Sequence, residues 1–320
     1  MVKKGILLLQ EARQEHQDEM KKLAPNYELV WEEEDGYSND FPEENIEIIY
    51  GWGAVGNKII DNKDNQVKWI HTSSSGVDYL PLDKLNEQGV RVTNVSGIHS
   101  VAIAESVIAM MLYRSRGLDY SVKQHERKEW KDLTQLFELN NQTMLIIGTG
   151  NIGKEVARLA KAFNMRTIGI NRSGQEVEHI DELYTQENLF EHIHKADVIV
   201  NILPLTKETK YLYDMAFFKK MKKEGTFINV GRGPSVKTDD LIQALKDGEL
   251  AFAGLDVVEE EPLPSDHPLW DVENVLITPH ISGVLEDYSQ SVFSIFSPNL
   301  KAYVAGQPFE LNQVDLKKGY

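Results

Sequence analysis

The feature that most constrains the fold is a glycine-rich segment, Gly148-Thr149-Gly150-Asn151-Ile152-Gly153, which directly follows the apolar run Met144–Ile147. A helix-like segment, Lys154–Phe163, comes next. A strand, three glycines at this spacing and a helix, in this order, are typical of the turn that binds the pyrophosphate of a dinucleotide. The pattern predicts a βα unit of a parallel sheet with a dinucleotide site at its turn.

Each of the three positions in this segment requires glycine for a different physical reason. Gly148 permits the tight turn, Gly150 lets the backbone approach a pyrophosphate, and Gly153 lets the helix pack close to the strand. The pyrophosphate then lies at the positive end of the helix. An ordinary glycine-rich turn between a strand and a helix is the alternative interpretation.

The next strand of such a unit ends about twenty residues later, at the residue that contacts the adenosine ribose. An acid is typical there for NAD, whereas this chain has Asn171-Arg172-Ser173. Because arginine forms charge-assisted hydrogen bonds with phosphate, the sequence favours a ribose 2′-phosphate, and therefore NADP, with NAD as the alternative. The other interpretation is that Arg172 is a solvated residue that lies over the adenine.

Apolar runs alternate with polar, helix-like segments along the chain, which predicts an α/β fold on mainly parallel sheets. The apolar helix-like segment Val101–Leu112 separates two series of runs, and 320 residues are enough for two cores. By pattern alone, the last helix-like segment, Leu285–Gly306, could join either domain. The expected strands are 5–9, 27–31, 46–50, 67–71 and 91–95 in the first series, and 144–148, 167–171, 197–203, 226–231, 252–257 and 275–279 in the second.

Composition excludes several classes of function. The chain has no cysteine, which rules out disulfides, thiolate nucleophiles and iron–sulfur clusters and fits a reducing cytoplasm. Its net charge of −16, with a dense acidic cluster at Glu32–Asp35, disfavours nucleic acid as a partner. No apolar stretch approaches the roughly 20 residues that cross a bilayer, so no membrane span is expected. No metal site is expected, because His192 and His194 would face different sides of a helix.

Past the glycine-rich segment, three polar motifs follow apolar runs, each at the expected end of a strand. They are Asn229–Gly233, Leu255–Pro262 and Thr278–Gly283. Ligands bind outside the carboxyl ends of strands in an open α/β sheet, so Arg232, Glu261 and His280 are expected to meet around one crevice. Taken singly, each residue has an ordinary structural explanation.

These motifs resemble those of the D-isomer-specific 2-hydroxyacid dehydrogenase family, of the glyoxylate/hydroxypyruvate reductase type. The resemblance is strongest over Asn140–Gly283. Outside that range, Thr72–Asp78 resembles the family's substrate-carboxylate loop, Val101–Leu112 its dimer-forming helix and Asn312–Tyr320 a common family ending. The resemblance implies a Rossmann-type, doubly wound cofactor domain, residues 99–284, inserted into a flavodoxin-like substrate domain, residues 1–98 plus 285–320.

The resemblance also implies an activity, the transfer of a hydride between NAD(P)H and a small 2-keto or 2-hydroxy acid with D specificity. Arg232 would hold the substrate with help from the backbone amides of Gly76 and Val77, His280 would be the acid/base, and Glu261 its partner. Reduction of a ketone builds negative charge on the carbonyl oxygen, which a cation and a proton donor stabilise. A carboxylate beside an imidazole favours its protonated form. The cofactor would lie against Gly148, Gly150, Asn151, Ile152, Gly153, Asn171, Arg172, Ser173, Pro204, Thr209 and Asp256.

Two departures from the family pattern and two rival functions remain open. The acid after the second cofactor strand is absent, and the lead-in Leu139–Thr143 lacks the family's commoner Gly-Lys-Thr type. One rival is a corepressor-like protein that senses NAD(H) with the same fold. The other is a relative that acts on formate or phosphite, although the formate branch generally has Gln where this chain has Glu261. The long apolar helix from Val101 predicts a homodimer, and the choice among glyoxylate, hydroxypyruvate and longer or branched 2-keto acids stays open.

Overall fold

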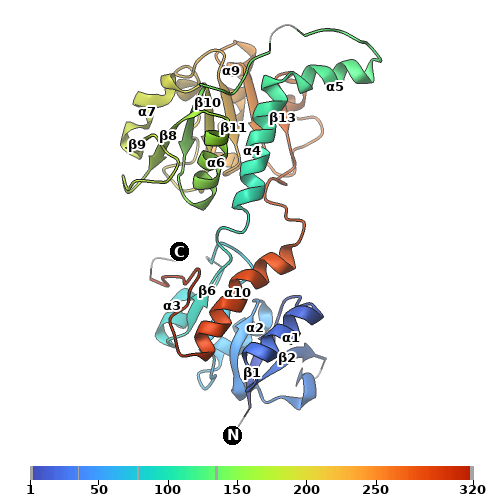
Figure 1. Cartoon of the computed structure of the whole chain (residues 1–320), viewed down its shortest axis with the longest axis vertical. Helices are drawn as coiled ribbons and strands as arrows, with labels where there is room; N and C mark the ends of the chain where they lie inside the picture. Colours follow the sequence, from blue (N-terminus) through green and yellow to red (C-terminus); the bar gives the residue numbers. More distant parts are fainter. Residues whose placement is uncertain (1–2, 35, 78, 134–135, 318–320) are drawn as a thin grey trace. The chain divides into compact units, whose positions relative to one another are not determined.

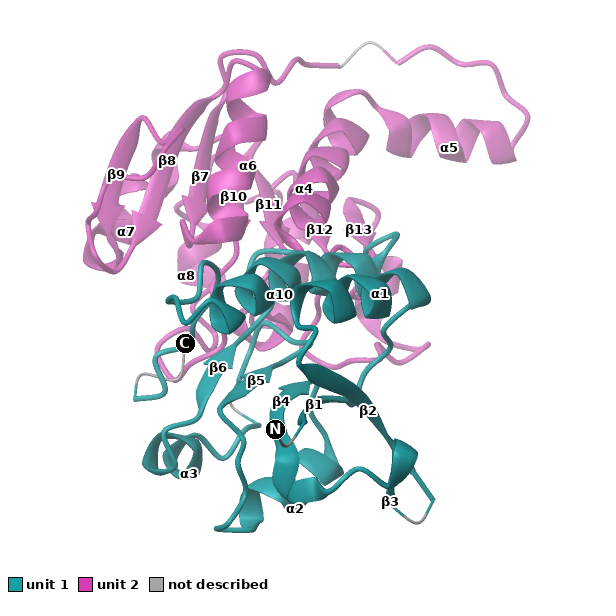
Figure 2. Ribbon diagram, turned by 60° about the horizontal axis from the view of Figure 1, so that its bottom comes forward, with its two compact units in different colours: residues 1–98, 285–320 teal, residues 99–284 magenta. Residues whose placement is uncertain are grey.

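The structure is a computed structural model that describes residues 3–34, 36–77, 79–133 and 136–317 (Figure 1). It divides into two compact units, unit 1 with residues 1–98 and 285–320, and unit 2 with residues 99–284 (Figure 2). Asp35 of the acidic cluster, Asp78 of the predicted substrate loop and residues 318–320 of the family-like ending lie outside the described residues. Both units contain a sheet of mainly parallel strands with helices on its faces, so the α/β fold class is confirmed.

Unit 1 is built on a six-stranded sheet in the order β3-β2-β1-β4-β5-β6. Neighbouring strands run parallel except β3, which pairs antiparallel with β2 at the edge. Without this edge strand, the order is that of flavodoxin-like sheets. The elements are β1 (Lys4–Leu8), α1 (Gln14–Leu23), β2 (Tyr27–Glu33), β3 (Gly36–Tyr37), η1 (Ser38–Asp40), η2 (Glu43–Asn45), β4 (Ile46–Tyr50), α2 (Ala54–Asp61), β5 (Trp69–His71), α3 (Leu82–Glu87), β6 (Arg91–Thr93) and α10 (Tyr288–Val304).

Both faces of the unit 1 sheet are buried, because successive side chains of a strand point to opposite sides. Ile6 and Ile48 pack in one cluster with apolar residues of α1 and α10. Their neighbours in the chain, Leu7 and Ile49, pack in another cluster with residues of α2 and α3. Since α10 contributes Phe293, Phe296 and Leu300 to the first cluster, the C-terminal segment completes the core of unit 1.

Unit 2 is built on a seven-stranded parallel sheet in the order β13-β12-β11-β10-β7-β8-β9. The chain reverses direction across the sheet between β7 and β10, the position at which Rossmann folds bind dinucleotides. The elements are α4 (Ser100–Ser115), α5 (Leu118–Glu126), β7 (Thr143–Ile147), α6 (Asn151–Ala162), β8 (Arg166–Asn171), β9 (Glu182–Thr185), η3 (Gln186–Asn188), α7 (Leu189–His192), η4 (Ile193–Lys195), β10 (Val198–Asn201), α8 (Met215–Phe218), β11 (Thr226–Asn229), η5 (Gly233–Ser235), α9 (Thr238–Lys246), β12 (Phe252–Leu255), η6 (Pro268–Asp271) and β13 (Val275–Ile277).

The unit 2 sheet has helices on both faces. Residues of α4 and α6 pack with Met144, Ile146 and Ile228 on one face. Residues of α7, α8 and α9 pack on the other face with alternate strand residues such as Leu145 and Phe227. Helix α5 extends away from this sheet (Figures 1 and 2). Within the described residues, no helix combines the length and apolar character that crossing a bilayer requires.

Candidate active site

The glycine-rich turn joins β7 to α6, and its geometry fits a dinucleotide. Gly148 has φ of 104°, in the left-handed region that favours glycine. A Cβ on Gly153 would lie 2.1 Å from the Gly148 carbonyl oxygen. Helix α6 can therefore pack this closely against the turn after β7 only because residue 153 has no side chain. A Cβ on Gly150 would have no described atom within 4 Å, which leaves its backbone open to a phosphate. Asn151 and Ile152 begin α6 and therefore lie at its positive end.

The predicted ribose contacts lie at the end of β8. The Asn171 side chain is used within its own loop, since Nδ2 donates to Thr149 Oγ1 at 3.1 Å and Oδ1 accepts from the Gly174 amide at 2.7 Å. Ser173 Oγ accepts from the amide of Gln175 at 3.3 Å. Arg172 is exposed, so its guanidinium is accessible to a ligand.

The loop after β10 lies beside the glycine-rich turn. A Cβ on Gly148 would contact the Leu203 side chain at 3.3 Å. The following turn is closed by Thr209, whose Oγ1 donates to the Pro204 carbonyl at 2.7 Å and accepts from the Thr206 amide at 2.7 Å. Pro204 and Thr209 are thus fixed at the reversal point of the sheet, where a dinucleotide is expected.

His280 lies on a loop that folds around a buried carboxylate. Asp256, which follows β12 and is 2% exposed, accepts hydrogen bonds from the amides of Ile281 and Ser282 at 2.9 and 3.1 Å and from the hydroxyls of Thr278 and Ser282. Its own carbonyl accepts from the His280 amide at 2.8 Å. These bonds hold His280 at φ of 54°, a conformation that a residue other than glycine adopts at a cost and that is found at functional sites.

Glu261 holds the His280 ring. The Nδ1 atom of His280 lies 2.8 Å from Oε2 of Glu261, and the other carboxylate oxygen accepts from the Val258 amide at 3.1 Å. About half of the His280 side chain, 55%, is exposed, and 37% of the Glu261 side chain. Because Nδ1 faces the carboxylate, Nε2 is the ring nitrogen that can exchange a proton with a substrate.

Arg232 lies on a loop fixed by buried polar side chains. Its carbonyl accepts hydrogen bonds from Ser235 Oγ at 2.6 Å and Asn229 Nδ2 at 3.2 Å. Asn201 Nδ2 in turn donates to both of these residues, and Tyr213 donates to Asn201. The guanidinium bonds only to the neighbouring Gly231 carbonyl among the described residues, at 2.7 Å, and is exposed.

The loops of Arg232 and Glu261 touch through their backbones. A Cβ on Gly233 would lie 1.6 Å from the Val258 carbonyl oxygen, so glycine is required there. Arg232, Glu261 and His280 therefore stand on three loops that follow β11, β12 and β13. The first two loops are in backbone contact, and the last two are joined by hydrogen bonds. A cation, a proton donor and its carboxylate at one edge of a parallel sheet can together assist the transfer of a hydride from a bound dinucleotide to a carbonyl group, by stabilising the developing negative charge and supplying the proton.

The remaining predicted residues lie apart from these loops in the chain. Gly76 is exposed and Val77 is buried in unit 1, where the Ser74 hydroxyl donates to the Gly76 carbonyl at 2.7 Å. His192 packs against Tyr184, with ring centroids 3.6 Å apart. The described ranges contain no group of three or more side chains able to hold a metal ion.

Asn229, Ser235 and Glu259 take part in the hydrogen bonds around the site, although the sequence predicts no role for them. Asn229 is a polar side chain at the end of the buried strand β11, two residues before the Gly-Arg-Gly run, and this position is the signal in the sequence that could have indicated a role for it. Glu259 has equivalent acids beside it, so the sequence alone does not distinguish it from Glu260.

A Rossmann-type unit with a histidine–carboxylate pair and an arginine after its last strands defines a dinucleotide-dependent oxidoreductase. Comparison with known proteins refines this class. Residues 108–282 match the family described as D-isomer specific 2-hydroxyacid dehydrogenase, NAD binding domain. The chain belongs to this family of D-isomer specific 2-hydroxyacid dehydrogenases.

Relatives and solved structures agree with the family. Glyoxylate reductase/hydroxypyruvate reductase of Homo sapiens is 33% identical over 259 residues, 79% of each chain. A D-isomer specific 2-hydroxyacid dehydrogenase family protein of Aeromonas salmonicida has 32% identity and a TM-score of 0.78, covering 98% of this chain and 99% of that one. NADPH-dependent glyoxylate/hydroxypyruvate reductase of Sinorhizobium meliloti, solved with NADP and sulfate, has 25% identity and a TM-score of 0.76, covering 99% and 100%.

Proposed function

We propose that this oxidoreductase of 2-hydroxy acids reduces a small 2-keto acid to the D-2-hydroxy acid, with His280, Glu261 and Arg232 as its reacting groups. The observation that carries the proposal is the 2.8 Å contact between His280 Nδ1 and Glu261. It leaves Nε2 of a charge-supported imidazole available to the substrate, which is what general acid catalysis requires.

Each residue of the trio has a separate role. The nicotinamide supplies the hydride when the cofactor is bound. His280 Nε2 gives its proton to the carbonyl oxygen of the keto acid, and Glu261 stabilises the positive charge of the imidazolium before that transfer. Arg232 binds the carboxylate of the substrate and stabilises the negative charge that develops on the carbonyl oxygen. The amides of Gly76 and Val77 are proposed to assist in binding the carboxylate.

The preferred cofactor is proposed to be NADPH. The exposed Arg172 supports this preference, since a guanidinium pairs with a ribose 2′-phosphate, and no acid stands at Asn171 to repel it. The relative from Sinorhizobium meliloti, which is NADPH-dependent by name, gives further support. The other cofactor contacts are proposed at Gly148, Gly150, Asn151, Ile152, Gly153, Ser173, Pro204, Thr209 and Asp256.

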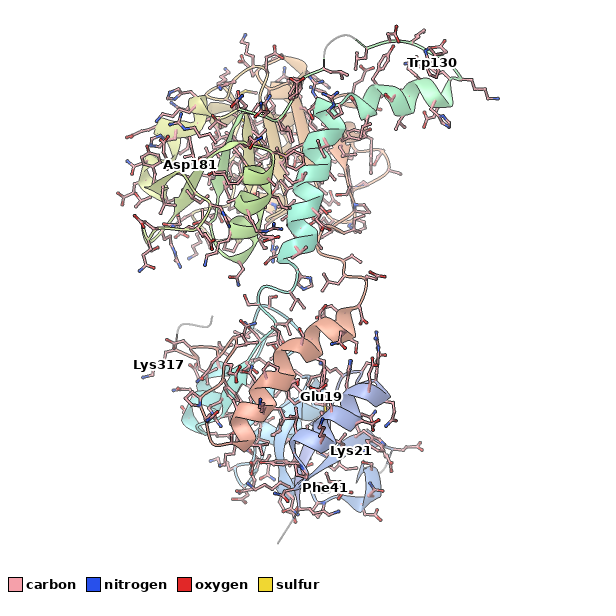
Figure 3. The ribbon with its side chains drawn as sticks, viewed as in Figure 1. Glu19, Lys21, Phe41, Trp130, Asp181 and Lys317 are labelled. Atoms are coloured by element: carbon pink, nitrogen blue, oxygen red, sulfur yellow. The ribbon has the colours of Figure 1, made fainter. Side chains whose placement is uncertain are left out.

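The working form is proposed to be a homodimer in the cytoplasm. Apolar side chains are exposed on α4, α5 and the segment after it, namely Val101 at 52%, Leu118 at 47%, Val122 at 50% and Trp130 at 99%. Figure 3 labels Trp130 among them. We propose that a second copy of the chain covers these side chains in the dimer. A light-scattering mass of one chain would contradict the dimer. The cysteine-free composition supports a reducing compartment.

The test is the loss of NADPH or NADH absorbance with glyoxylate, hydroxypyruvate and longer or branched 2-keto acids. We expect at least one acid to be reduced, with a higher kcat/KM for NADPH than for NADH. Equal or better use of NADH would contradict the cofactor preference. Cofactor binding without turnover of any keto acid would instead favour a regulatory protein that senses the dinucleotide.

A further inference from the structure

One acid of the run Glu259–Glu261 connects three segments of unit 2. Oε1 of Glu259 accepts a hydrogen bond from the Tyr211 hydroxyl at 2.6 Å, and Oε2 accepts from the amide of Thr238, the first residue of α9, at 3.3 Å. Burial alone raises the pKa of Glu259, but the bonds from Tyr211 and Thr238 outweigh it and the pKa lies below its usual value. The carboxylate is therefore ionised at neutral pH and accepts both bonds.

Tyr211 is tied to the loop of Arg232. Its amide donates to the carbonyl of Pro234 at 3.0 Å, two residues after Arg232. Its backbone has φ of 55°, a left-handed conformation that is unfavourable for a bulky residue. The bond from its hydroxyl to Glu259 is a specific interaction that a glycine, which adopts this conformation without strain, could not make.

Glu259 in turn stands within the loop that holds His280. The residue before it, Val258, donates its amide to Glu261 Oε1 at 3.1 Å, and the other oxygen of Glu261 faces His280. Val258 also presents its carbonyl to Gly233, beside Arg232. A displacement of Val258 and Glu259 would therefore change the orientation of Glu261 and its distance from the Arg232 loop together.

We propose that Tyr211 and Glu259 are positioning residues. They hold the Glu261 loop against the Arg232 loop so that His280 and Arg232 can contact the same substrate molecule. This inference rests on the proposed function of Arg232, Glu261 and His280. It assigns no contact with substrate or cofactor to either positioning residue.

The first test is Tyr211→Phe, which removes one hydroxyl and keeps the ring. The kcat for the keto acid should fall on the order of tenfold, the effect of one hydrogen bond to a charged group. The affinity for NADPH, measured by fluorescence titration, should stay at the wild-type value. The basic limb of the pH–rate profile should move to lower pH, the direction that is also expected when the charge of Glu261 is removed by Glu261→Gln. Tyr37→Phe is the matched control, because it removes the bond of a tyrosine to Glu43 in unit 1.

A double-mutant cycle separates positioning from general stability. If Tyr211 acts through Glu261, then Tyr211→Phe should cost little further activity once Glu261→Gln is present. Glu259→Gln offers rescue, because its carbonyl can accept from the Thr238 amide while its NH₂ donates to Tyr211, so it should lose much less activity than Glu259→Ala. Additive losses in the cycle, or equal losses for Gln and Ala, would overturn the proposal.

Amide hydrogen exchange gives a readout without substrate. In Tyr211→Phe, exchange should speed up in a peptide that covers residues 256–262 and stay unchanged in peptides of unit 1. Wild-type exchange there would overturn the proposal even if activity fell. If the wild-type protein reduces no 2-keto acid, the proposed function fails, whereas the exchange experiment still decides whether Tyr211 holds this loop.

Discussion

His280 Nδ1 lies 2.8 Å from Oε2 of Glu261, although the two residues are 19 positions apart in the chain. Glu261 follows β12 and His280 follows β13, so the parallel pairing of these strands brings the loops to one edge. The contact sets which ring nitrogen faces the carboxylate and which can meet a substrate. The proposed chemistry depends on this relationship.

Replacing His280, the proposed proton donor, is the first test of this chemistry. His280→Ala should lower kcat by a factor on the order of 100 to 10,000, the usual contribution of general acid–base catalysis. Binding of NADPH should be nearly unchanged, since no cofactor contact is assigned to His280. Steady-state kinetics and a fluorescence titration measure the two effects, and His194→Ala, at an exposed position of η4, is the control. Near-normal turnover would remove His280 from the mechanism.

Replacing the carboxylate tests the pair itself. Glu261→Gln keeps the shape of the side chain and removes its charge, so the imidazolium loses its partner. The basic limb of the pH–rate profile should move to lower pH, and activity above neutral pH should fall most. Glu260→Gln, one residue earlier, is the matched control. An unchanged profile in Glu261→Gln would show that another group supports His280.

Replacing Arg232, the cation proposed to bind the substrate, should distinguish effects on substrate binding from effects on cofactor binding. Arg232→Ala removes a charged contact of about 1.5–3 kcal/mol to the bound acid as well as stabilisation of the developing negative charge. KM for the keto acid should rise and kcat should fall, while the affinity for NADPH stays close to that of the wild type. Arg232→Lys keeps the charge without the planar fork and should recover only part of the activity. An effect on the cofactor alone would contradict the assignment.

The fold class followed from the sequence because buried parallel strands give short apolar runs. Strand β4 has the expected bounds, whereas β10 and β12 end two residues before the apolar runs do, since the chain leaves the sheet at its carboxyl edge. Strands β3 and β9 were not predicted. The first has two residues, and the second, Glu182–Thr185, is a half-buried edge strand without an apolar run.

The candidate site could be predicted where a charged or polar residue lies in the loop that follows a strand. Arg232, Glu261 and His280 do not follow a strand directly but lie three to six positions after β11, β12 and β13, in the loops at their carboxyl ends, whereas the hydrogen bonds that hold these loops come partly from residues distant in sequence, such as Asn201. Asp256 was predicted as a cofactor contact, and that role stays a prediction. Its carboxylate accepts bonds from Thr278, Ile281 and Ser282, so it also fixes the loop of His280, which no spacing rule indicates.

A buried histidine in unit 1 should make the fold sensitive to acid. His71 packs among Tyr50 and Phe296, its Nδ1 lies 2.8 Å from Thr93 Oγ1, and burial lowers its pKa to about 3. The pKa of a histidine in the unfolded chain is about 6.5. Between about pH 3 and pH 6.5 the unfolded chain therefore binds a proton at His71 that the folded chain does not bind. The stability contribution is complete above about pH 6.5 and is lost as the pH falls toward about 3, by up to ~1.4 kcal/mol per pH unit.

Thermal unfolding of wild type and His71→Phe as a function of pH measures this effect. The phenylalanine keeps an aromatic ring in the core and does not titrate, so the decrease of Tm between about pH 6.5 and pH 4.5 should be shallower. His194→Gln, at an exposed histidine of η4, should keep the wild-type slope. A wild-type slope in His71→Phe would mean that His71 is not the acid-sensitive group.

The most direct test of the central claim follows the hydride itself. The wild-type protein is given a 2-keto acid and NADPH that carries deuterium at the transferable position of C4 of the nicotinamide, and the product is analysed by mass spectrometry and chiral chromatography. We predict a D-2-hydroxy acid with one deuterium at C2, and on the order of 100-fold or more less of this product with His280→Ala over the same time. Oxidation of the cofactor without deuterium at C2 of a 2-hydroxy acid would contradict the account.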